Sequence, residues 1–192
     1  MKTIRRIVTV ALVFSFMTTT GTAFAQVDYD NMLEEKRTIV DAQWRHYAWQ
    51  QAWDANFGVQ VCPIDGEHQF INSWGARRSG GRRHRGTDLM AEYGVPLVAL
   101  ENGTVHLGEN RLGGITINLD GVGGDRFYYA HMQEYAEDLR DGQRVIAGEL
   151  LGFVGSSGNA QVSHLHFGQY KSGRAVNPYH LLTHLCNDVE QH

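Results

Sequence analysis

From Cys62 onward the sequence alternates short apolar stretches with glycine-rich turns, and this pattern constrains the fold more than any other feature. Short apolar segments that recur between turn signals are typical of an all-β domain. We therefore expect a mainly β fold, a compact antiparallel sheet or sandwich preceded by one N-terminal α-helix. The apolar segments begin at Phe70-Ile71 and continue at 96–100, 104–107, 114–119, 126–132, 145–155 and 163–170.

Two dipeptides in this region predict tight hairpin turns. Asn102-Gly103 and Asp120-Gly121 each follow an apolar segment. Asn-Gly and Asp-Gly favour two-residue hairpins because both central residues must adopt positive φ. Each dipeptide is therefore expected to join two paired strands.

Residues 31–56 are expected to form a helix within an N-terminal segment, 26–58, that precedes the main domain, 59–192. Asn31 and Glu34 resemble a capping box, and apolar side chains from Leu33 to Ala52 recur at helical spacing before Gly58. One interpretation is that the aromatic stripe packs on the main domain or on a partner. The alternative is a pro-segment or lid, through which a regulatory partner would act.

The first 25 residues have the composition of a secretory signal peptide. Three basic side chains precede an apolar run, 7–17, and Ala23-Phe24-Ala25 offers a cleavage site before Gln26. The alternative is an uncleaved anchor. Cleavage removes three of 17 basic side chains and none of the 21 acidic ones, so the formal net charge moves from −4 to −7. We expect an exported protein (periplasm, cell envelope or secreted) with no membrane span after cleavage and no nucleic-acid partner.

Only two cysteines, Cys62 and Cys186, are present. A structural zinc site usually needs more thiolates at short spacing. In an oxidising compartment a single disulfide from the start of the domain to its end is the expected arrangement.

Two clusters of polar side chains predict a metal site. His164 and His166 are two residues apart in an apolar segment, so a strand would present both on one face. Upstream, His84 and Asp88 lie on a Gly-rich loop entering another apolar segment, and His131 ends an aromatic one. Imidazole and carboxylate are good zinc ligands, and three protein ligands plus water make an open catalytic site.

These motifs, in this order, resemble those of the lysostaphin/LytM-type zinc metalloendopeptidases. The motifs are His84-x-x-x-Asp88, Tyr129-Ala130-His131 and His164-Leu165-His166-Phe167, and the phrases around them include Gly86-Thr87-Asp88, Gly148-Glu149-Leu150-Leu151-Gly152 and Asn177-Pro178. The resemblance covers about residues 60–182. It implies a compact β domain with a groove across the sheet.

The resemblance implies a role for each of five side chains. His84, Asp88 and His166 would hold one zinc ion, and His131 and His164 would be the catalytic histidines. A zinc-activated water would attack peptide bonds in the cross-bridges or stems of bacterial peptidoglycan. His164 is expected to serve as the base, and His131 to orient water or to stabilise the oxyanion. The alternative function is a non-catalytic domain of this fold that binds or activates another cell-wall hydrolase.

Several features depart from the family pattern or lie outside it. Gly168 stands where many relatives carry Glu. Trp74, in a Ser-Trp-Gly turn, is expected in the core rather than on a substrate-facing wall. The arginines before and around His84 are expected to form a solvated loop; the alternative is that some steer carboxylates of stem peptides toward the groove. These arginines are Arg77, Arg78, Arg82, Arg83 and Arg85.

Overall fold

The computed structural model describes residues 29–186, so the predicted signal peptide lies outside the described residues. By its internal contacts the chain divides into two compact units between Ala42 and Gln43. The mainly β prediction is confirmed. The elements in chain order are α1 (Tyr29–Ala55), β1 (His68–Phe70), the 3-10 turn η1 (Ser79–Gly81), β2 (Thr87–Ala91), β3 (Pro96–Val98), β4 (Gly103–Asn110), β5 (Gly114–Gly121), β6 (Asp125–Tyr135), β7 (Arg144–Val145), β8 (Leu150–Val154), β9 (His164–Lys171), β10 (Arg174–Val176) and α2 (Tyr179–Cys186).

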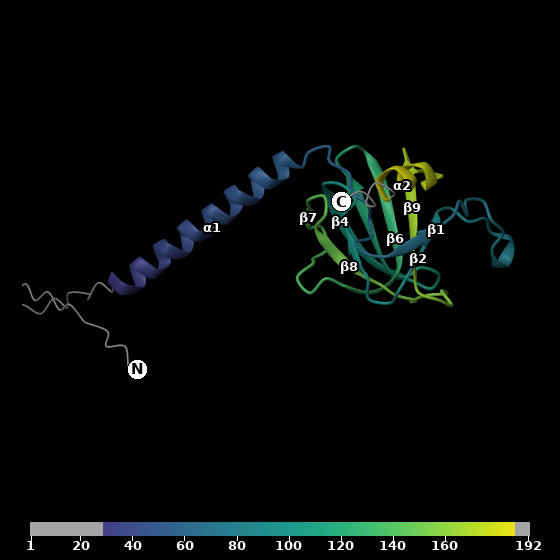
Figure 1. Cartoon of the computed structure of the whole chain (residues 1–192). Helices are drawn as coiled ribbons and strands as arrows, with labels where there is room; N and C mark the ends of the chain where they lie inside the picture. The colour runs from purple at the N-terminus through teal and green to yellow at the C-terminus, as the bar shows by residue number, and fades with distance from the viewer. Residues whose placement is uncertain (1–28, 187–192) are drawn as a thin grey trace, which may run out of the picture. The chain divides into compact units, whose positions relative to one another are not determined.

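One antiparallel sheet holds the domain together, in the strand order β1-β2-β9-β6-β5-β4-β7. β10 pairs with β9, and β8 joins β3 to β6. β9 therefore lies between β2 and β6, although 72 residues or more separate it from β2 in the sequence (Figure 1). This placement brings the predicted motifs of β2, β6 and β9 onto neighbouring strands.

The apolar side of the sheet forms one continuous core. Alternate residues of β6 and β9, among them Phe127, Tyr129, Leu165 and Phe167, are fully buried there. The hydroxyl of Tyr129 donates to Val98 O and accepts from Leu100 N, so its polar end is satisfied. Burial raises the Tyr129 pKa well above its ordinary value, and the negative charge of Glu101 adds to the shift, while the hydrogen bond from Leu100 N opposes it only in part.

The C-terminal part of α1 is attached to the β domain by polar and aromatic contacts. The side chain of Asn102, fully buried, donates to Trp53 O at 2.8 Å and accepts from Ala147 N at 2.8 Å. The Arg144 guanidinium lies over the rings of Trp49 and Trp53. Neither helix of the described part of the chain is apolar enough over a sufficient length to cross a bilayer.

The aromatic residues of the predicted stripe of α1, Trp44 and Tyr47, take no part in these contacts. Trp53 is buried, whereas Trp44 is 66% exposed and Tyr47 is 56% exposed. The interpretation that the stripe packs on the main domain is therefore wrong for Trp44 and Tyr47. The contacts with the domain are made instead by Trp49 and Trp53, which were not part of the predicted stripe.

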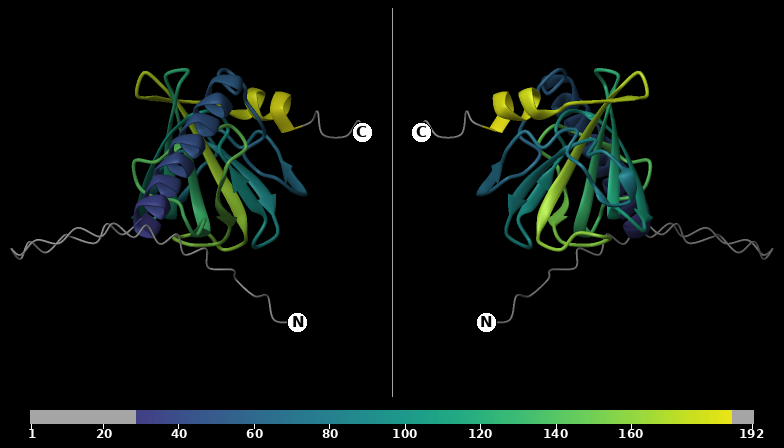
Figure 2. Two further views of the ribbon diagram at one scale, coloured as in Figure 1. Left: turned by 90° about the vertical axis from the view of Figure 1, so that its left-hand side faces the viewer. Right: turned by 90° about the vertical axis from the view of Figure 1, so that its right-hand side faces the viewer.

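A short C-terminal helix, α2, which was not predicted, covers one end of the strands (Figure 2). Leu182 and Cys186 on α2 are buried in the core. The Cys62–Cys186 disulfide predicted above is present in the structure, with the two Cα atoms 4.9 Å apart. It fastens α2 to the segment that leads into β1.

The Asn102-Gly103 hairpin prediction is wrong. β3 pairs with β8, not with β4, and neither Asn102 nor Gly103 has a positive φ. The physical reason is that the buried Asn102 side chain makes two hydrogen bonds, to Trp53 O of α1 and from Ala147 N of the β domain, and these fix its conformation. At the second dipeptide β5 and β6 do form a hairpin, but the positive φ falls on Gly124.

Candidate metal centre and active site

Strand pairing sets the first part of the site. In the β2–β9 ladder Asp88 lies directly opposite His166, and Met90 lies opposite His164. Because side chains alternate along a strand, both histidines and the aspartate lie on one face, while Leu89, Leu165 and Phe167 enter the core behind them. His84 reaches the same place from the loop before β2.

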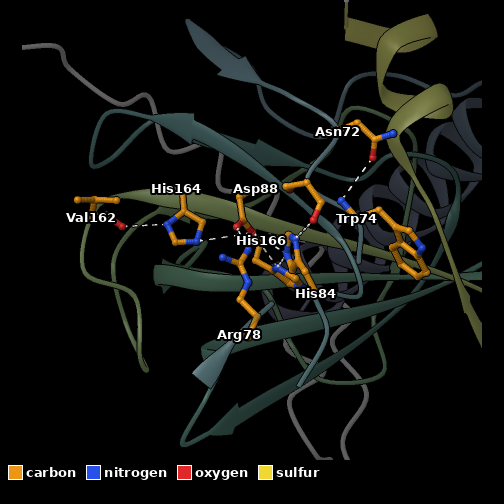
Figure 3. Close-up of polar contacts among 9 residues, drawn as sticks. Asn72, Trp74, Arg78, His84, Asp88, Val162, His164 and His166 are labelled. Atoms are coloured by element: carbon orange, nitrogen blue, oxygen red, sulfur yellow. Dashed lines mark hydrogen bonds and ion pairs between the residues drawn. The ribbon is translucent and has the colours of Figure 1, made fainter. Parts of the chain in front are cut away.

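Three atoms from these side chains converge. Asp88 Oδ1 is 3.0 Å from His84 Nε2 and 2.9 Å from His166 Nδ1, and the two ring nitrogens are 2.9 Å from each other. Figure 3 shows the three side chains pointing toward one another, with dashed lines for these contacts. Two imidazoles and one carboxylate form a ligand set that zinc accepts.

The hydrogen positions of this cluster fit a cation. Ser73 O can only accept, so His84 Nδ1, 2.9 Å away, carries the ring hydrogen. The Nε2 lone pair of neutral His84 then faces Asp88 Oδ1, which is also an acceptor. Of the three atoms that contact one another, His84 Nε2, Asp88 Oδ1 and His166 Nδ1, only His166 Nδ1 can still carry a hydrogen. The three contacts therefore cannot all be hydrogen bonds. A metal ion among the three atoms would remove this repulsion.

The charge state of Asp88 fits the same interpretation. Burial would raise the Asp88 pKa, but hydrogen bonds and charge interactions with His166 and His84 outweigh it and hold the pKa well below its ordinary value. Burial also lowers the His166 pKa. An ionised carboxylate is the form of Asp88 that metal binding requires.

Arg78 contacts the outer oxygen of the same carboxylate. Its Nη2 atom donates to Asp88 Oδ2, while Oδ1 faces the histidines (Figure 3). The prediction of a purely solvated arginine loop is therefore wrong for Arg78. Sequence reasoning did not find this contact, because the nine residues between Arg78 and Asp88 fold back through η1 with no periodicity to reveal it.

His131 reaches the site because β6 contains a bulge. Ile115 pairs with Met132 and Ile117 with Tyr129. The paired residues are therefore two positions apart on β5 but three apart on β6, which leaves one extra residue on β6. Without the extra residue, His131 would share the core face with Tyr129; the bulge turns it to the groove face instead. His131 has φ 65°, a left-handed conformation that is uncommon for a non-glycine residue and often found at functional sites.

Ser157 supports this bulge from the loop between β8 and β9. Its hydroxyl accepts from Ile115 N at 3.0 Å and donates to Met132 O at 2.7 Å, bridging the strands where their register shifts. Its carbonyl oxygen is 2.9 Å from His131 Nδ1, and His131 N donates to Gly113 O. The strained backbone is thus fixed on both sides.

His131 and His164 form a pair beside the cluster, with ring centroids 4.7 Å apart. Each donates its Nδ1 hydrogen to a backbone carbonyl, His131 to Ser157 O and His164 to Val162 O. Each Nε2 is therefore an acceptor, and that of His164 lies 3.8 Å from Asp88 Oδ1. Burial lowers the His131 pKa to about 4, opposed by its hydrogen bond to Ser157.

All five predicted side chains open into one groove of about 890 Å³. Trp74, in the segment between β1 and β2, is half-buried and does not line this groove. It is also absent from the hydrophobic core, so its predicted core position is wrong. The groove is lined by the arginine-bearing loop before β2 (Arg78, Ser79, Gly81, Arg82, Arg83 and Arg85), by the β4–β5 turn (Asn110, Leu112 and Gly113), by the β8–β9 loop (Asn159, Ala160, Gln161 and Val162), and by Met90, Tyr128, Ala130 and Tyr170 around the five.

Gly86 gives the side chains of the His84, Asp88 and His166 cluster room to converge. A Cβ atom at this position would lie 2.5 Å from Phe167 O and 2.7 Å from His166 Cε1. Any side chain there would push His166 out of place. The glycine of the Gly86-Thr87-Asp88 motif is thus needed for the close approach of the loop to β9.

The fold and the cluster of two histidines and an aspartate define a class of β-sheet domain with a metal-type site in an open groove. Residues 82–178, about half of the chain, match Peptidase family M23. The chain belongs to this family.

Three relatives illustrate the similarity. The L-Ala–D-Glu endopeptidase of Bacillus subtilis is 38% identical over 131 residues, 61% of this chain and 40% of the relative. The glycyl-glycine endopeptidase ALE-1 of Staphylococcus capitis is 30% identical over 142 residues, 69% of this chain and 34% of the relative. The solved catalytic domain of lysostaphin from Staphylococcus simulans is 28% identical, with a TM-score of 0.54, covering 60% of this chain and 92% of that domain. The chain spans at most about two fifths of the length of these two curated relatives.

Proposed function

We propose that this protein is an exported zinc metalloendopeptidase that hydrolyses peptide bonds in bacterial peptidoglycan. In this proposal residues 1–25 direct export, residues 59–192 form the catalytic domain, and the helical segment before it has no catalytic part. The observation that carries the proposal is the convergence of His84 Nε2, Asp88 Oδ1 and His166 Nδ1 within 3.0 Å of one another, beside two further imidazoles.

The proposed ligands are His84, Asp88 and His166. When bound, zinc would lower the pKa of a coordinated water and polarise the scissile carbonyl. The ligand atoms lie at the floor of an open groove, so a peptide can reach them from solvent. Ser73 O fixes the tautomer of His84, and Arg78 occupies the oxygen of Asp88 that faces away from the histidines.

His164 is the proposed general base. Val162 O holds its Nδ1 hydrogen, so Nε2 can take the proton of the attacking water and then return it to the leaving amine. His131 has the same acceptor geometry at Nε2 and a lowered pKa. A neutral ring whose hydrogen is used by Ser157 O cannot donate to an oxyanion, so we assign His131 to orienting the water.

The test combines metal analysis with cell-wall zymography. Purified protein should contain about one zinc per chain and clear a band in a gel containing sacculi. A chelator should abolish the clearing, and added zinc should restore it. Full clearing by protein shown to be metal-free would contradict the proposal, as would a zinc-loaded protein that releases no peptide from sacculi.

A further inference from the structure

The loop that carries His84 also carries a concentration of positive charge. Four arginines of this loop line the groove: Arg78, Arg82, Arg83 and Arg85. The only carboxylate among the groove-lining residues is Asp88, which faces His84, His166 and Arg78. The chain as a whole has a formal net charge of −4, so the excess of positive charge in the groove is opposite in sign to the net charge of the chain.

Three of these arginines have no acidic partner. None of the ion pairs in the described part of the chain involves Arg82, Arg83 or Arg85. All three side chains are exposed. Arg126 and Lys171, by contrast, each pair with an aspartate of the sheet. The positive charge in the groove is therefore available to a ligand.

Two of the three are oriented by contacts that leave donors free. Arg82 donates through Nε to Ser79 O and through Nη2 to Ser79 Oγ. Arg83 donates through Nη1 to Gly75 O. Neutral partners of this kind hold a guanidinium in place without neutralising it, and its remaining N–H groups suit a carboxylate.

The other loops of the groove have a different character. The β4–β5 turn contributes Asn110 and Leu112, and the β8–β9 loop contributes Asn159, Gln161 and Val162. None of these side chains is charged. A peptide in the groove would therefore meet positive charge from the loop before β2 alone, close to the cluster, because Arg83 and Arg85 flank His84 in the sequence.

We infer that Arg82, Arg83 and Arg85 determine specificity, and that the groove selects peptides with free carboxylates next to the scissile bond rather than neutral glycine bridges. This inference rests on the proposed peptidase function. The substrate class is an acidic stem peptide, in which a glutamate and a carboxylated diamino acid present two or more free carboxylates. A glycyl-glycine bridge offers no side-chain charge to these guanidinium groups.

The experiment uses the zinc-loaded full-length protein and a cross-linked stem-peptide dimer in two forms, one with free carboxylates and a twin with every one amidated. We expect kcat/KM to be higher for the free form, by up to about fivefold for each exposed ion pair that forms. The preference should shrink as salt is raised from about 0.1 M to about 1 M, because the screening length falls from roughly 10 Å to roughly 3 Å.

Variants assign the preference to the loop. In R82Q/R83Q/R85Q the ratio of the two kcat/KM values should fall to about 1, and R82K/R83K/R85K should recover part of it. The control R174Q removes an exposed arginine that does not line the groove, and should keep the parental ratio. Zinc content and the thermal midpoint of each variant show that it is folded and loaded.

The outcomes separate the two levels of the proposal. Equal cleavage of both twins by the parental enzyme, or an unchanged preference in the triple glutamine variant, overturns the inference and leaves the peptidase function standing. If zinc-loaded protein cuts neither twin and releases nothing from sacculi, the peptidase function fails and the inference falls with it.

Discussion

The Arg78 guanidinium and the Asp88 carboxylate are joined so that the two oxygens of Asp88 have different partners. Oδ2 accepts from Arg78, and Oδ1 faces His84 and His166. A carboxylate held in this way presents one defined oxygen to a metal. Groups that orient ligands from behind typically change metal affinity when they are removed.

Replacing Arg78 by alanine should therefore weaken zinc binding roughly 10–100-fold. Competition with a chromogenic chelator measures this directly, independently of turnover. R78K should recover part of the affinity, because it keeps the charge but not the fork geometry. R77A is the matched control, since the neighbouring exposed arginine makes no side-chain contact with the cluster; an R78A protein with parental zinc affinity would contradict the role given to Arg78.

The five site residues should separate into two phenotypes. His84→Ala, Asp88→Ala and His166→Ala are expected to lose bound zinc, because each removes one of three protein ligands. His131→Ala and His164→Ala are expected to keep zinc and lose cell-wall hydrolysis by roughly 10²-fold or more. Metal content by plasma spectrometry, read beside activity on sacculi, checks both groups. An H131A enzyme that hydrolyses at the parental rate would refute the assignment.

Ser157 should matter for stability as well as for activity. Ser157→Ala leaves Ile115 N and Met132 O without their partner at the bulge, and should lower the free energy of unfolding by about 1–3 kcal/mol. Hydrolysis should fall further than zinc content, since the bulge positions His131 and none of the proposed ligands. Urea unfolding gives the stability. Ser156→Ala, at an exposed neighbouring hydroxyl, is the control and should be neutral.

Gly86→Ala should damage the cluster by crowding. Its Cβ would meet Phe167 O at 2.5 Å and the His166 ring at 2.7 Å, so His166 or the strand must move. We expect a loss of about 1–3 kcal/mol in unfolding free energy together with reduced zinc content. Gly168→Ala makes a sharp comparison, because its Cβ would lie no closer than 3.4 Å to any neighbour. Equal zinc content in the two variants would show that close packing at Gly86 is not needed.

Much of the site could be predicted from the sequence because it depends on strand periodicity. The spacing of His164 and His166 puts both on one face of any strand, and the pairing of β2 with β9 then brings Asp88 opposite His166. The order of the motifs, through their resemblance to a known family, supplied the expected roles of the five side chains. The alternation of apolar segments and turns was likewise sufficient for the mainly β fold.

The remainder depends on contacts that no local pattern encodes. Strict alternation would have put His131 in the core with Tyr129, and the bulge that prevents this is set by Ser157, 26 residues further along the chain. Asn102-Gly103 has the composition of a hairpin, yet burial between Trp53 and Ala147 determines its conformation. The contact of Arg78 with Asp88 depends on a loop without periodicity. In each case tertiary contacts overrode a local preference.

The shared strand of His164 and His166 limits how this protein could change over generations. Since a proposed base and a proposed ligand lie two positions apart on β9, inserting or deleting one residue between them would turn one of the rings into the apolar interior. We therefore expect no insertion or deletion between His164 and His166 to be tolerated. Diversification of substrate choice must come from the loops around the groove, which can lengthen, shorten or exchange charges while the catalytic register stays intact.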